Sequence, residues 1–125
     1  MTMKSDMTDG EWLAGLFAAI DAMDTTAFVG YLAESGEFRF GNLPPVVGHA
    51  AIAQFVSGFF ASIKSLKHEV EAFWRSGDHL ICRGTVTYVR HDAREVRVPF
   101  ANILRIENGV AGDYRIYADA SALFA

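Results

Sequence analysis

The second half of the chain alternates long segments of strand-forming sequence with very short polar turns. The turns lie at 76–78, 91–94 and 107–109. Strands joined by so few residues must be antiparallel neighbours, because a parallel connection needs a crossover of about a dozen residues. The pattern therefore predicts an antiparallel meander of four strands, over 67–75, 79–90, 95–106 and 110–118.

The first half of the chain favours helices. Thr8 and Glu11 have the spacing of a capping box, and the apolar residues after them repeat at helical intervals. Asp24 is a second candidate N-cap, and we expect the short helix after it to continue through Leu32. A third helix is predicted over 49–63.

Between the second and third helices, 37–40 alternates like a short strand. The following segment, 41–48, contains two prolines and two glycines and is expected to be irregular. Because helices come first and the meander second, the expected fold class is α+β, in one domain over 1–125.

Composition excludes several classes of protein. The chain has 125 residues, 51% of them hydrophobic, which excludes disorder as the default state. Eleven basic against fifteen acidic residues, without a basic run, argue against nucleic acid or an anionic membrane as a partner. The sequence has no apolar run of about 18 residues for a membrane span and no apolar signal-peptide core. We therefore expect a soluble cytoplasmic protein.

No cofactor or metal is expected. The lone Cys82 excludes an intramolecular disulfide and a multi-cysteine metal site, and it reads as a small buried hydrophobe. The histidines and carboxylates lack the spacing of metal ligands, and no glycine-rich phosphate loop occurs.

Alternation along the strands sorts side chains onto two faces. The even-numbered positions are richer in apolar residues and should face the helices, yet they include two polar residues, His68 and Asn102, which need partners when buried. The odd-numbered face is also too apolar for a free surface, which predicts a homodimer formed sheet against sheet. Its apolar residues are Phe73, Ile81, Val89, Ala101 and Ile103.

Three short runs carry a resemblance to a known family: Ala-Met-Asp at 22–24, Gly-His-Ala-Ala-Ile at 48–52 and Tyr-Arg-Ile-Tyr-Ala-Asp at 114–119. In this order and spacing the chain resembles the nuclear-transport-factor-2-like superfamily, in its SnoaL-like and ketosteroid-isomerase-like branch. The resemblance implies a cone, in which a strongly curved, mainly antiparallel sheet wraps around three N-terminal helices. It also implies an apolar pocket open at one end and dimerisation through the outer sheet face.

The resemblance does not carry a known catalytic set into this chain. The catalytic Asp of the ketosteroid isomerases corresponds to Gly41, and the Asp of the SnoaL-type cyclases corresponds to Ile116. The two oxyanion-hole positions of the isomerases correspond to Leu16 and Asn102. Of these, Asn102 alone keeps a hydrogen-bond donor, which an amide provides at any pH.

His68 and Asn102 are therefore the candidate catalytic residues. His68 would act as acid or base, because the pKa of histidine lies near neutrality, and Asn102 would donate to a ligand oxygen. Alternatively, His68 is a core histidine bonded to a backbone carbonyl or to Tyr88. Candidate ligand-binding residues, each of which could also be plain core, are Trp12, Leu16, Phe55, Phe59, Trp74, Tyr88, Tyr114 and Ile116.

Two functions follow from these residues. The first is an enzyme or binding protein for a small apolar carbonyl or polycyclic ligand, isomerase- or cyclase-like. The second is a non-catalytic dimeric module for binding or interaction, whose cavity is filled by its own aromatic side chains.

Overall fold

The computed structural model describes residues 4–124 and forms three α-helices and a six-stranded sheet. The strand order is β2-β1-β6-β5-β4-β3, in which β1 runs parallel to β6 and all other neighbours are antiparallel. In chain order the elements are α1 (Asp9–Asp21), α2 (Thr25–Val29), β1 (Leu32–Phe40), β2 (Val46–Val47), α3 (His49–Ala61), β3 (Ser65–Ser76), β4 (His79–Val89), β5 (Glu95–Glu107) and β6 (Val110–Tyr117), with short 3₁₀ turns at Lys4–Asp6 and Ser121–Phe124.

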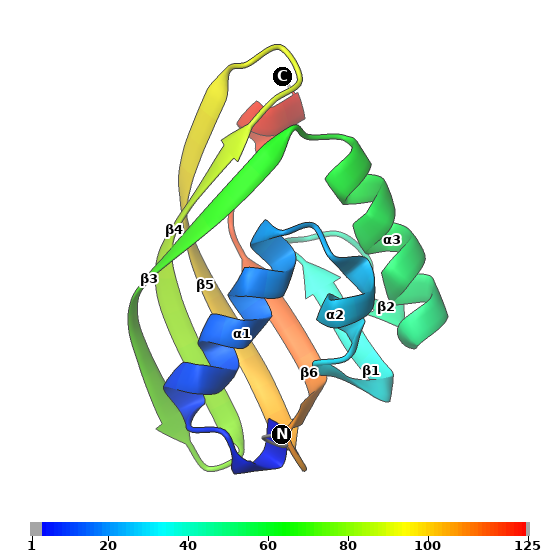
Figure 1. The fold of residues 1–125 in the computed structure, drawn as a ribbon, viewed down its shortest axis with the longest axis vertical. Coiled ribbons are helices and arrows are strands. Elements are labelled where there is room, and N and C mark those ends of the chain that lie inside the picture. The colour runs from blue at the N-terminus through cyan, green and yellow to red at the C-terminus, as the bar shows by residue number, and fades with distance from the viewer. Residues whose placement is uncertain (1–3, 125) are drawn as a thin grey trace.

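Figure 1 shows the long strands twisting around the helices, with α1, α2 and α3 all on one side of the sheet. The expected α+β fold, a curved and mainly antiparallel sheet around N-terminal helices, is confirmed. Within the described residues no helix has the length and apolarity needed to cross a membrane.

Both predicted helix caps are present. The Thr8 hydroxyl accepts a hydrogen bond from the backbone N–H of Glu11 at 3.1 Å, and the Glu11 carboxylate accepts one from the Thr8 backbone N–H at 2.9 Å. The carboxylate of Asp24 accepts from the Ala27 N–H at 3.0 Å and starts α2. These bonds satisfy backbone N–H groups of the first helical turn, which have no partner within the helix. They join residues three apart, so the sequence alone is enough to predict them.

The prediction that the second helix continues through Leu32 is wrong. The helix α2 ends at Val29, and Leu32 begins β1, where it pairs with Ala111 of β6. Pairing with a strand distant in sequence therefore overrides the local apolar spacing. The segment 41–48 is also not wholly irregular, since Val46 and Val47 pair with Phe38 and Glu37 of β1.

A β-bulge in β3 overturns the predicted faces of its second half. Val70 pairs with Gly84 and Ala72 with Arg83, so Glu71 is an extra residue. An extra residue moves every later side chain of the strand to the opposite face. Trp74 consequently lies opposite Ile81 on the outer face, half exposed, and Phe73 lies opposite Cys82 on the inner face.

The helix α1 packs against the inner face of the sheet. Leu16 is fully buried, and Trp12 is almost so, with its indole N–H donating to the Gly109 carbonyl at 2.8 Å. This bond anchors the start of α1 to the turn between β5 and β6. The end of α1 lies over β3, where its last residue, Asp21, bonds His68.

The bulge brings β3 unusually close to β4 at Gly84. A Cβ atom at Gly84 would collide with the backbone carbonyl of Glu69. We predict that Gly84→Ala lowers the free energy of unfolding by about 2 kcal/mol or more, measured by urea denaturation. Gly58→Ala, in α3 with open space around the new methyl, should instead raise it by about 0.5 kcal/mol. Equal effects would contradict the close approach.

Candidate functional site

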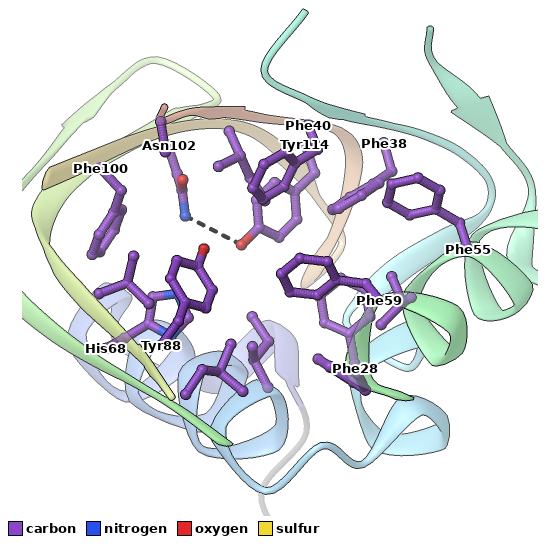
Figure 2. Close-up of a pocket in the computed structure, with 17 residues that line it drawn as sticks. Phe28, Phe38, Phe40, Phe55, Phe59, His68, Tyr88, Phe100, Asn102 and Tyr114 are labelled. Carbon is purple, nitrogen blue, oxygen red and sulfur yellow. Dashed lines mark hydrogen bonds between the residues drawn. The ribbon is translucent and has the colours of Figure 1, made fainter. Parts of the chain in front are cut away.

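A cavity of about 50 Å³ lies between the helices and the inner face of the sheet. Its lining is mostly aromatic and includes seven phenylalanines. Figure 2 shows how these rings surround the cavity. All three helices contribute to it, as do β1, β3, β4, β5 and β6. Its residues therefore come together only when the whole chain is folded.

The aromatic wall is a set of rings in mutual contact. The ring of Phe38 on β1 contacts those of Phe55 on α3, at 5.8 Å between centroids, and Tyr114 on β6, at 5.4 Å. Phe59 of α3 contacts Phe40 at 5.8 Å and Tyr88 at 5.9 Å. These contacts hold α3 against the sheet and give the cavity a continuous apolar side.

The polar atoms of the cavity lie close together, around the amide of Asn102. The Asn102 side chain is 1% exposed, and its Nδ2 atom donates to the Tyr114 hydroxyl at 3.2 Å. Its Oδ1 atom is buried and has no hydrogen-bond partner in the described structure. The hydroxyl of Tyr88 points toward the same two side chains in Figure 2. A ligand entering this apolar space would meet its hydrogen-bonding groups in one place.

His68 also lines the cavity, and Asp21 holds its ring. The Nδ1 atom of His68 lies 2.7 Å from Oδ1 of Asp21, and the other carboxylate oxygen accepts from the His68 backbone N–H at 3.0 Å. The ring stacks on Phe17 at 4.6 Å and meets the edge of Phe100 at 5.2 Å. With Nδ1–H donating to the carboxylate, the neutral ring keeps its lone pair on Nε2.

Burial keeps the neighbouring groups protonated. It raises the pKa of Tyr88 to about 12 and that of the Cys82 thiol to about 11. It also raises the pKa of the fully buried Tyr114 well above its ordinary value. Both tyrosines are therefore neutral hydrogen-bond donors at physiological pH, and Cys82, opposite Asn102 in the sheet, is an unreactive thiol.

Most residues proposed from the sequence as site residues lie on the cavity wall, but three do not. Trp12 and Leu16 are core residues outside the lining, because they lie on the part of α1 that precedes Ile20, the lining residue of this helix. Trp74 lies on the outer face, because of the bulge at Glu71. Those on the wall are Phe55, Phe59, His68, Tyr88, Asn102, Tyr114 and Ile116.

Sequence reasoning missed Asp21 as the partner of His68. It expected a backbone carbonyl, Tyr88 or a pocket facing Asn102. A signal was present, since Asp21 is the last residue of α1, where the helix dipole disfavours a carboxylate and a partner is expected. No pattern in the sequence indicates that His68 is that partner.

The positions corresponding to the family's catalytic carboxylates offer none here. Gly41 lies in the turn after β1 with a φ of 57°, a conformation that favours glycine. Ile116 places an apolar side chain on the cavity wall. The carboxylate that bonds the cavity histidine is that of Asp21, at the end of α1, which is neither of these two positions.

Comparison with known proteins agrees with this architecture. The sequence profile of the SnoaL-like domain matches residues 13–111. The chain belongs to the SnoaL-like domain family. A search of curated proteins finds no significant match to this SnoaL-like chain.

Solved structures share the fold of this SnoaL-like protein at low sequence identity. A hypothetical protein with a ketosteroid-isomerase-like fold from Catenulispora acidiphila, in complex with trimethylamine, has a TM-score of 0.84 at 19% identity, covering 93% of this chain and 91% of that one. An NTF2-like protein of unknown function from Burkholderia pseudomallei has a TM-score of 0.83 at 17% identity, covering 94% and 96%. TerC, co-crystallised with polyporic acid, has 0.80 at 16%, covering 93% and 95%.

The buried tyrosines predict a loss of stability at alkaline pH. Folding raises the pKa of Tyr88 to about 12, so the unfolded chain releases this proton first as the pH rises. The free energy of unfolding should then fall by about 2 to 3 kcal/mol between pH ~10 and pH ~12 on account of Tyr88 alone.

Urea denaturation across this pH range measures the loss. Tyr88→Phe should show a shallower fall than the wild type, because it lacks this proton. Tyr117→Phe, which removes the hydroxyl of a half-exposed tyrosine, should leave the slope unchanged. A slope that is identical in the Tyr88→Phe variant would contradict the burial of its hydroxyl.

Proposed function

We propose that this SnoaL-like protein binds a small apolar carbonyl compound in its cavity. It would remove and return a proton at the carbon next to the carbonyl group, as an isomerase or a cyclase does. The observation that carries this proposal is the His68–Asp21 pair, at 2.7 Å, on the wall of an apolar cavity that also holds Asn102. A base, a hydrogen-bond donor and a water-poor surrounding are what proton abstraction beside a carbonyl requires.

In the proposed reaction, Nε2 of His68 takes the proton from the carbon next to the carbonyl. The electron pair of the broken C–H bond forms a C=C bond, and the carbonyl π electrons move onto the oxygen. Hydrogen bonds from the Tyr88 hydroxyl or the Asn102 amide stabilise the resulting negative charge. Asp21 stabilises the imidazolium, and His68 returns the proton to the same or another carbon.

The size of the cavity limits the ligand. A cavity that holds benzene measures about 150 Å³, so the present space of about 50 Å³ admits one ring only after an aromatic side chain moves outward. Phe55 and Phe59 on α3, both partly exposed, are the side chains best placed to do so. A one-ring ketone therefore fits the proposal better than a polycyclic compound. The crystallisation of TerC with polyporic acid supports an organic ligand for this fold.

The test is hydrogen exchange at carbon. The wild-type protein should accelerate deuterium incorporation next to the carbonyl of cyclohexanone in D₂O, followed by NMR. His68→Gln should slow the exchange by about 100-fold, because the base is lost.

The matched control is His79→Gln. His79 also contacts an aspartate, Asp78, at 3.0 Å, but this pair lies at the surface, so the exchange rate should not change. The proposed reaction would be wrong if the exchange rate fell equally in both variants, or if the wild-type protein gave no faster exchange than buffer alone.

The second candidate function, a non-catalytic dimeric module, rests on the outer face of the sheet. Trp74 is 51% exposed there and lies in register with Ile81 and Ile103, both partly exposed. Arg83 and Glu71 border them, so the face carries both signs of charge and can pair with its own copy about a two-fold axis. We propose a homodimer through this face, as the sequence indicates, with Trp74 in the place expected for Phe73.

Ile103→Lys tests the dimer. The wild type should have twice the 13.7 kDa mass of the chain by light scattering, and the variant should have the mass of one chain. Thr87→Lys places the same charge on the same face, between Lys67 and Arg97 and away from Trp74, and should leave the mass at that of the dimer. A wild type that is monomeric at all concentrations would exclude this interface.

We also propose a cytoplasmic location. The single cysteine, Cys82, is fully buried as a free thiol, and a protein without disulfides is compatible with a reducing compartment.

A further inference from the structure

The amide of Asn102 is only half satisfied. Its Nδ2 atom donates to Tyr114, but its Oδ1 atom is buried without a hydrogen-bond partner in the described part of the chain. Leaving a buried acceptor unpaired costs about 1 to 3 kcal/mol. Most of the cavity wall around it is aromatic or aliphatic and has no donor to offer.

The donors on the wall are few. Tyr114 already accepts from the amide, and Figure 2 shows the Tyr88 hydroxyl directed toward this pair. Neither lysine nor arginine is among the described residues that line the cavity. An anionic ligand would therefore lose its hydration with His68 as its one possible cation, which disfavours a carboxylate or a phosphate.

We infer that the cavity selects a neutral α-hydroxy ketone: the hydroxyl of the ligand donates to Oδ1 of Asn102, and its carbonyl oxygen accepts from the Tyr88 hydroxyl. This inference rests on the proposed function and narrows its ligand. The hydroxyl satisfies the one unpaired amide atom, and the neighbouring carbonyl uses a donor that burial keeps protonated. Apart from the carbon that faces His68, the rest of the ligand contacts aromatic and aliphatic side chains, so it must be apolar.

A matched pair of ketones tests the inference. 2-Hydroxycyclohexanone and 2-methylcyclohexanone have the same ring, carbonyl and size, and differ only in an OH or a CH₃ beside the carbonyl. An apolar cavity without a polar requirement prefers the methyl compound, because the hydroxyl loses its hydration. We expect the opposite: by isothermal titration calorimetry the wild type should bind the hydroxy ketone about tenfold more tightly.

Three variants assign the preference to Asn102. Asn102→Leu removes the acceptor and should bind the methyl ketone at least as tightly as the hydroxy ketone. Asn102→Asp keeps an acceptor oxygen in the same position and should retain the preference for the hydroxy ketone. Asn42→Leu, at an exposed asparagine in the turn after β1, controls for the substitution itself and should bind like the wild type. Circular dichroism verifies the fold of each variant.

The outcomes separate this inference from the proposed function. If the wild type binds the methyl ketone as tightly as the hydroxy ketone, the amide does not accept from the ligand. The inference then fails while binding of apolar carbonyl compounds stands. A preference that persists in Asn102→Leu also overturns the inference. If neither ketone binds the wild type, the proposed function fails and the inference fails with it.

Discussion

The close approach of β3 to β4 determines how this molecule is organised. Glu71 is an extra residue in β3, and Gly84 gives the space in which the Glu69 carbonyl passes β4. A bulge bends and twists its strand, so the long strands curl around α1 instead of forming a flat sheet. The curved sheet and the helices together enclose the cavity.

That enclosed space brings polar groups into an apolar interior, which has a physical cost. At His68 this cost is offset by Asp21, which bonds both its ring and its backbone N–H, and by contact with the aromatic rings of Phe17 and Phe100. At Asn102 it is offset only in part, since one amide atom has a hydrogen-bond partner and the other has none. An apolar residue at this position would avoid the cost of an unpaired oxygen, and this is why Asn102 carries the proposed contact to a ligand.

Much of the fold could be predicted because it depends on local interactions. The capping box of Thr8 and the cap of Asp24 each join residues three apart, and the meander follows from turns of a few residues. Errors arose where distant segments meet. Leu32 joins β1 because of Ala111, and Trp74 faces outward because of one extra residue, which no periodicity in the sequence reveals.

The candidate site shows the same division. Alternation along the strands was enough to place His68 and Asn102 on the inner face, because side chains of a regular strand alternate. His68 precedes the bulge in β3, and Asn102 lies on another strand, β5. The sequence by itself thus determined the α+β class, the helix caps and the polar residues of the interior. The tertiary structure alone decided that Asp21 holds His68, that Trp74 faces outward and that one Asn102 oxygen has no partner. These depend on contacts between residues distant in sequence, and only the packed chain specifies which atoms meet.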